Sequence, residues 1–134
     1  MTQGASSSTL LLDTSVIIDL LRNRNQRRAL LEQLVVSGRV LATSAISIAE
    51  VYSGLRPGEE AGTRAQLANL EWLPVSANIA EQAGLMKAAF SRLGRTHSIT
   101  DMIVAATALE NGLDLATDNR KDFAGTGLVL LELP

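Results

Sequence analysis

Four acidic residues, far apart in the chain, stand at places where strands are expected to end or helices to begin: Asp13, Glu50, Asp101 and Asp118. Clustered carboxylates repel one another unless a cation compensates them. Mg²⁺ and Mn²⁺ prefer such oxygen ligands and keep several waters. A cation held in this way activates water for phosphodiester hydrolysis. If the four side chains meet, they indicate metal-dependent hydrolysis of a phosphodiester.

The elements that would bring these acids together can be predicted from local sequence patterns. The apolar run "TLLLD" (9–13) is typical of a strand buried on both faces of a parallel sheet. Further strands are expected at 39–44, 71–76, 113–117 and 127–133. Helices are expected at 14–23, 25–38, 44–55, 59–70, 76–94 and 98–112. This alternation predicts an α/β class, a three-layer α/β/α fold with a central, mostly parallel sheet of four to five strands.

The predicted fold places the four acids at one edge. Ligand sites in such folds form at the carboxyl ends of the strands. Asp13 ends the first strand and Asp118 follows the strand "LDLAT", whereas Glu50 and Asp101 lie early in helices that begin at the same edge. Each acid also has a local explanation, as a helix cap, a capping-box residue or a turn residue. These explanations account for the acids singly, and the convergence of all four favours a site.

Composition narrows the classes of site further. The chain of 134 residues contains no cysteine and one histidine, His97, so disulfides, thiolate metal sites and a zinc centre are not expected. The net charge of −2 gives no general attraction to nucleic acid. No stretch is long and apolar enough to cross a bilayer. We expect a cytoplasmic protein with a flexible leader at 1–8 and a single domain at 9–134.

At this point the chain resembles the PIN domain family, and in particular the VapC-type toxins of type II toxin–antitoxin systems. The resemblance rests on four blocks, in order "LLLDTSVIIDLL", "TSAISIAEVYSGL", "SITDMIVAATALENGLDLAT" and "TDNRKDF". It implies a PIN-like fold and a Mg²⁺-dependent endoribonuclease, with Mn²⁺ as substitute, that cleaves RNA with a metal-activated water. It also implies a homodimer, neutralised by a VapB-like antitoxin in a heterotetramer or a larger assembly.

The resemblance assigns roles to particular residues. Asp13, Glu50 and Asp101 match three family acids, which are catalytic and would bind the metal. Thr14 and Ser15 match polar positions that orient the first acid or a metal-bound water.

The fourth family acid has two candidates. Relatives often read T-x-D or T-x-N after the fourth strand, which points to Asn119, whereas Asp118 lies one position earlier. Either Asp118 supplies the fourth catalytic carboxylate, or Asn119 acts through water, with Thr117 as a supporting hydroxyl. Asp122 and Phe123 match a common family ending that we interpret as structural.

The substrate side rests on one basic cluster, "RNRNQRR". It makes Arg22, Arg24, Arg27 and Arg28 candidate RNA-binding residues, with a solvated helix face as the alternative. Phosphate contacts of this kind supply affinity without sequence information.

Three classes of protein other than an active nuclease would make different demands on these residues. The displaced fourth acid leaves open a weak or inactive PIN-like module that acts by binding RNA or protein. A receiver-like domain or a haloacid-dehalogenase-like phosphatase would need a second acid beside Asp13, and "LLLDTS" provides none. Asp19 is expected at the surface, away from the site.

Overall fold

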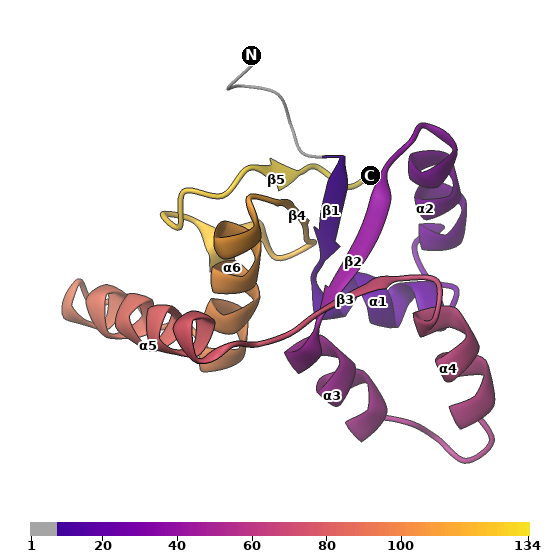
Figure 1. Ribbon diagram of the computed structural model, residues 1–134, viewed down its shortest axis with the longest axis horizontal. Coiled ribbons are helices and arrows are strands. Elements are labelled where there is room, and N and C mark those ends of the chain that lie inside the picture. Colours follow the sequence, from indigo (N-terminus) through magenta and orange to yellow (C-terminus); the bar gives the residue numbers. More distant parts are fainter. Residues whose placement is uncertain (1–7) are drawn as a thin grey trace.

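A computed structural model describes residues 8–134 of the chain (Figure 1). The leader expected at 1–8 lies, apart from Ser8, outside the described residues. Five strands form one sheet, in the order β3-β2-β1-β4-β5, and every neighbouring pair is parallel. The strands are β1 (Thr9–Leu12), β2 (Val40–Ser44), β3 (Glu71–Leu73), β4 (Asp114–Ala116) and β5 (Leu130–Leu131).

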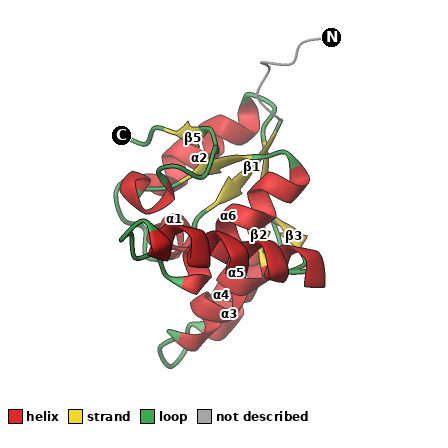
Figure 2. Cartoon of the chain, turned by 90° about the vertical axis from the view of Figure 1, so that its left-hand side faces the viewer, coloured by secondary structure: helices red, strands yellow, loops and turns green. Residues whose placement is uncertain are grey.

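Helices cover both faces of the sheet, so the predicted three-layer α/β/α class is confirmed. On one side lie α1 (Thr14–Leu21), α2 (Arg27–Val36), α3 (Ala45–Ser53) and α4 (Glu60–Leu67). On the other lie α5 (Ala77–Arg92) and α6 (Ile99–Asn111), the side from which Figure 2 is seen. A short 3₁₀ helix, η1 (Arg120–Phe123), follows β4.

The central strand β1 explains why the first apolar run has no polar alternation. Leu11 packs into the core beneath α5 and α6, whereas Leu10 and Leu12 pack into the core on the side of α1 to α4, and all three are fully buried. A strand between two helical layers must be apolar on both faces. The run therefore ends where the sheet opens, at Asp13.

The two edge strands are shorter than the apolar patterns predict. Only Leu130 and Leu131 of the expected strand 127–133 pair with β4, because β4 itself offers three residues and Gly127 has a φ of +85°. At the opposite edge, β3 ends at Leu73, before Pro74, as expected for an edge position. Trp72 on this edge is half-exposed, and its indole N–H donates to the Leu67 carbonyl.

Among the helices of the described region, none is long and apolar enough to cross a membrane.

Candidate active site

Asp13 lies directly after β1, at the centre of the carboxyl edge of the sheet, and is 3% exposed. Its backbone N–H donates to Ala116 of β4, which fixes Asp13 beside the residue that follows β4, Thr117. The Thr117 hydroxyl donates to Asp13 Oδ2 at 2.7 Å, and the Thr14 N–H donates to Oδ1 at 2.8 Å. Asp13 is therefore the N-cap of α1 and also a buried carboxylate held on both oxygens.

Burial raises the pKa of the Asp13 carboxyl above its ordinary value. The hydrogen bonds from Thr117 and Thr14 act against this shift, and the nearby Asp101 carboxylate adds to it. Ser15 contributes a longer contact, 3.4 Å from its hydroxyl to Oδ2. A buried carboxylate whose neighbour is another carboxylate is a site that gains free energy from a cation.

Glu50 reaches this edge from α3, in the layer opposite Asp101. Ser44 caps α3 through its side chain, in agreement with the expected helix at 44–55. Glu50 therefore lies in the second turn, so a capping-box role in the first turn does not explain it. The Thr14 hydroxyl donates to Glu50 Oε1 at 2.7 Å and lies 2.8 Å from the buried Ser47 Oγ. Thr14 thus connects Glu50 to the backbone that carries Asp13.

Asp101 lies in the first turn of α6, and its N–H donates to the side chain of the N-cap, Ser98, at 3.0 Å. Burial raises the pKa of the Asp101 carboxyl, Ser98 lowers it, and the Asp122 carboxylate raises it again. The charge of His97 acts in the opposite direction and lowers the pKa of Asp101. His97 is buried, with its ring 4.5 Å from that of Phe90.

Asp122 is a candidate that sequence reasoning missed. We interpreted it as a structural residue, but its carboxylate is close enough to Asp101 to disfavour the charge there. It lies on η1, which the buried Phe123 anchors to the core. An acid four residues after Asp118, in the same loop, was the available signal.

The Asp118 side chain pairs with an arginine and not with the other acids. Its Oδ1 accepts a 2.6 Å hydrogen bond from Nη2 of Arg27, on α2. Asn119, the other candidate for the fourth position, donates its backbone N–H to the Thr117 hydroxyl oxygen at 2.9 Å. Of the four predicted acids, Asp101 acts on Asp13 through its charge, Thr14 links Glu50 to Asp13, and Asp118 pairs with Arg27.

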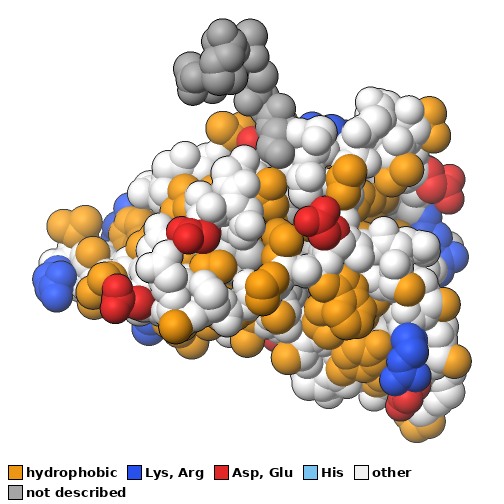
Figure 3. Space-filling model, viewed as in Figure 1, with side chains coloured by type: hydrophobic (Ala, Val, Ile, Leu, Met, Phe, Trp, Pro, Cys, Tyr) orange, Lys and Arg blue, Asp and Glu red, His pale blue; other side chains and the backbone are white. Residues whose placement is uncertain are grey.

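The basic cluster is also divided. Arg27 is 2% exposed, so its expected contact with RNA is wrong: a buried guanidinium in an internal ion pair cannot reach a substrate. Arg22 pairs with Glu59 at 2.6 Å, whereas Arg24 and Arg28 are exposed. On the face shown in Figure 3, Lys and Arg side chains lie at the margins and hydrophobic side chains occupy the middle.

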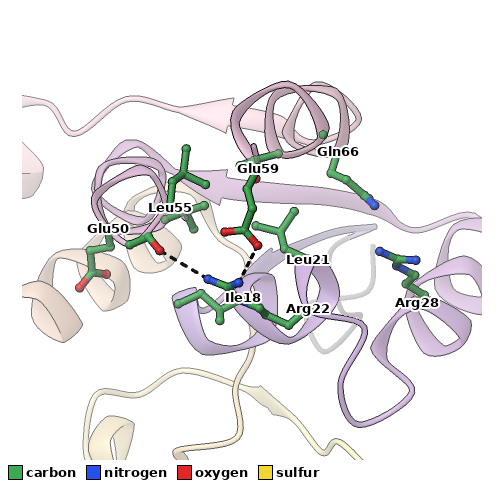
Figure 4. A pocket seen from close by; sticks show the side chains of 12 residues that line it. Ile18, Leu21, Arg22, Arg28, Glu50, Leu55, Glu59 and Gln66 are labelled. Carbon is green, nitrogen blue, oxygen red and sulfur yellow. Dashed lines mark hydrogen bonds and ion pairs between the residues drawn. The ribbon is translucent and has the colours of Figure 1, made fainter. Parts of the chain in front are cut away.

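A pocket of about 240 Å³ lies between α1, α3 and α4, and Glu50 is the one predicted acid that lines it. In Figure 4, Glu50 lies at one end and Arg28 at the other, with apolar side chains between them and the Arg22–Glu59 ion pair across the middle. The apolar lining includes Ile18, Leu21, Val51 and Leu55.

The oxygen donors at this edge fit a divalent cation only with help from water or substrate. Over residues 8–134, no three Asp, Glu, His or Cys side chains converge closely enough to hold a metal by themselves. Mg²⁺ is commonly bound by one or two carboxylates, with waters and substrate phosphate completing its shell. Asp13, which is buried, and Asp101, which is partly exposed and whose carboxylate disfavours the charge of Asp13, fit that pattern.

The fold and this acidic edge define a known class. The model of the PIN domain family matches residues 10–127, and the chain belongs to this family. Among curated relatives, ribonuclease VapC19 from Mycobacterium tuberculosis is 30% identical over 113 residues, which cover 84% of this chain and 90% of the relative.

Two solved structures are similar to this chain. A toxin–antitoxin complex from Klebsiella pneumoniae contains a chain that is 30% identical, with a TM-score of 0.75, over 92% of this chain and 96% of that one. VapBC2 from Rickettsia felis, bound to a DNA fragment from its promoter, has a TM-score of 0.79 over 94% and 99% of the two chains. At 21% identity, the second likeness shows the fold alone.

Proposed function

We propose that this protein is a VapC-type ribonuclease toxin that hydrolyses RNA phosphodiester bonds with a divalent cation, Mg²⁺ or Mn²⁺. The observation that carries the proposal is the buried Asp13 carboxylate, which is held by Thr14 and Thr117 and whose charge the Asp101 carboxylate disfavours. Structural stability alone does not explain a buried acid whose neighbour disfavours its charge. The match to the PIN family and to ribonuclease VapC19 supports the same reaction class.

The residues divide the work by position. Asp13 and Asp101 would hold the cation, which when bound supplies an activated water and stabilises charge on the phosphate oxygens. The Thr117 hydroxyl and the Thr14 N–H each bond one oxygen of the Asp13 carboxylate and so fix its orientation before substrate binds. Glu50, held by Thr14, is placed to complete the same site or to take a proton from the attacking water.

We further propose the partners that this class implies. The toxin would form a homodimer and be neutralised by a VapB-like antitoxin, in a heterotetramer or larger, and would act in the cytoplasm. The Klebsiella pneumoniae relative was solved as a toxin–antitoxin complex. The apolar and charged lining of the pocket that ends at Glu50 supports binding of an inhibiting antitoxin segment there.

The test is RNA cleavage by the purified protein with Mn²⁺ or Mg²⁺, repeated with EDTA. We expect Asp13→Asn and Asp101→Asn each to lower the rate about a hundredfold or more, because each removes an oriented carboxylate from the cation site. Asp19→Ala is the matched control, since Asp19 accepts from Asn25 and is remote from the site. If both variants cleave RNA at the parent rate, the proposed mechanism is wrong.

The alternative is a PIN-like module that binds RNA or protein without cleaving it. The position of Asp118, paired with Arg27, is the observation that favours this alternative. RNA binding without any metal-dependent cleavage, unchanged in Asp13→Asn, would support it over the nuclease. Sequencing of cellular RNA after induced expression would identify the target if cleavage occurs.

A further inference from the structure

Arg27 is the most deeply buried charged residue outside the acidic edge, and it joins three parts of the chain. Its Nη2 donates to Asp118 Oδ1 at 2.6 Å, and its Nη1 donates to the carbonyls of Asn25 and Pro134, each at 3.1 Å. Within the described residues, its Nε is buried without a hydrogen-bond partner. The partner is less buried than Arg27, since the Asp118 side chain is 32% exposed. An ion pair with a solvent-accessible partner contributes little to stability, so the position of this one calls for another reason.

The segment that Arg27 holds is the one that touches Asp13. Asp118 stands between Thr117, whose hydroxyl donates to Asp13 at 2.7 Å, and Asn119, whose N–H donates back to the Thr117 hydroxyl at 2.9 Å. Fixing the side chain of Asp118 therefore fixes the backbone between these two groups.

The sheet does not hold this segment by itself. The ladder between β1 and β4 ends at Leu12 and Ala116, and η1 begins only at Arg120. Residues 117–119 lie between these two elements, and Asn119 has φ −107° and ψ 59°, outside helix and strand. The ion pair to Arg27 is the tertiary contact that the Asp118 side chain makes across this gap, from a residue 91 positions away.

We propose that Arg27 is a positioning residue for RNA cleavage, whose ion pair with Asp118 keeps the Thr117 hydroxyl where it orients Asp13. Asp118 then acts through Arg27 and not as a fourth carboxylate of the site. This inference rests on the proposed ribonuclease function, but the hydrogen bonds that it concerns can be measured without catalysis.

The chain provides a matched control at the other end of the same strand. Arg39, which follows α2, pairs with Asp114, the first residue of β4, at 3.7 Å, and their side chains are 20% and 14% exposed. Both ion pairs link the ends of α2 to the ends of β4, but only the pair of Arg27 adjoins Thr117. A purely structural role would affect both pairs.

The first experiment compares Arg27→Met with Arg39→Met, at a temperature where circular dichroism shows both folded. We expect Arg27→Met to lower kcat for a short RNA about tenfold to a hundredfold with KM little changed, the size expected for a small misplacement of a catalytic group. Arg39→Met should keep kcat within about twofold of the parent, because its ion pair is remote from the groups that orient Asp13. Equal effects of the two variants would overturn the proposal.

The second experiment is a double-mutant cycle between Arg27 and Asp118. If Asp118 acts through Arg27, Asp118→Asn lowers kcat in the parent but has little further effect in Arg27→Met, because interacting residues are not additive. If Asp118→Asn lowers kcat by the same factor in both backgrounds, Asp118 acts on its own and the proposal is wrong.

The third experiment separates this inference from the proposed function. Amide hydrogen exchange at Asn119, followed by NMR in the metal-free protein, should be faster in Arg27→Met and unchanged in Arg39→Met. Arg27→Lys keeps the charge but not the planar guanidinium group. Its exchange rate at Asn119 should lie between those of the parent and Arg27→Met. It replaces Arg27→Met in the comparison if that variant does not fold. Unchanged exchange in the Arg27 variants overturns the positioning role, whereas absent RNA cleavage by the parent overturns the proposed function alone.

Discussion

Asp13 combines two roles that usually belong to different residues. As the N-cap of α1 it satisfies a backbone N–H, and as a buried acid it has a raised pKa. Replacing its charge therefore has opposite consequences for folding and for cleavage, and these consequences can be measured separately.

We expect Asp13→Asn to be inactive and yet to have a higher Tm than the parent at pH 7 in EDTA. The Asp13 carboxyl has its ordinary value, 3.8, in the unfolded chain and a higher pKa in the folded one. The folded state then binds more protons between these values, so the contribution of Asp13 to stability is present below 3.8 and is lost as the pH rises through the folded pKa. Asn at position 13 is uncharged at every pH, so the variant avoids this loss of stability at pH 7.

The measurement is thermal unfolding of the metal-free protein across pH 3 to 8, by circular dichroism. Asp19→Asn serves as the control, because its side chain is solvent-accessible and bonded only to Asn25. A lower Tm for Asp13→Asn than for the parent at pH 7 would contradict the prediction.

Asp122 yields a second prediction at this scale. Because its carboxylate adds negative charge that attracts a cation held by Asp101, we expect Asp122→Asn to weaken Mn²⁺ binding and lower kcat about tenfold, as changes next to metal-binding carboxylates commonly do. Steady-state cleavage of RNA with Mn²⁺ tests this, with the exposed Glu132→Gln as control. Parent-like kcat in Asp122→Asn would show that the acid has no part in the reaction.

Sequence reasoning placed Asp13 and Asp101 well and Asp118 poorly, for a physical reason. The position of Asp13 follows from where an apolar strand ends, and that of Asp101 from the serine three residues before it. The direction of the Asp118 side chain depends on Arg27, a residue 91 positions away that resembles a solvated arginine in sequence. No local pattern contains that information.

At the scale of elements, the capped N-terminus of a helix positions an acid at the site. Ser98 caps α6 and receives the N–H of Asp101 itself, whereas Ser76 caps α5 in the same way and receives the N–H of Ile79. The two caps are chemically alike, and only one adjoins a candidate catalytic residue.

We therefore expect Ser98→Ala and Ser76→Ala to lower the free energy of unfolding by similar amounts, about 1 kcal/mol each. Only Ser98→Ala should also lower kcat, because it frees the first turn that carries Asp101. Urea unfolding and RNA cleavage on the same preparations test both parts. A similar loss of kcat in both variants would mean that overall stability, not the position of Asp101, determines the rate.

Helix boundaries were predictable to within a few residues where the caps were unambiguous. The segment "TSAISIAE" contains two serines, and α3 begins after the first, Ser44, in agreement with the expected helix at 44–55. This start puts Glu50 in the second turn, where Thr14 reaches it, and no local pattern indicates that contact. The hydrogen bond between Thr14 of α1 and Glu50 of α3 is a tertiary contact.

At the scale of the molecule, α1 to α4 and the pair α5 and α6 lie on opposite faces of the sheet and contribute different acids to its edge. The α/β/α class was predictable because strands buried on both faces read as continuous apolar runs. The strand order β3-β2-β1-β4-β5 was not, because it depends on which strands pair.

A cation bound between the two layers should stabilise the whole fold. At a Mn²⁺ concentration of a hundred times Kd, we expect a gain of about 2.7 kcal/mol in the free energy of unfolding, from mass action. The gain should disappear in Asp13→Asn, and should shrink as the pH falls and the carboxyls, whose pKa values are raised, take up protons. Thermal unfolding with Mn²⁺ and with EDTA tests this, and an equal shift in Asp13→Asn would place the cation elsewhere.

The position of Trp72 determines what optical probes will report. It is the only tryptophan in the chain, and it lies half-exposed on the edge strand β3, not in either core. Its emission will already be that of a hydrated indole in the folded protein, so it will change little on unfolding. The same property makes it a built-in label: a blue shift on adding a protein partner or a second copy of the chain would show that the β3 edge has been covered.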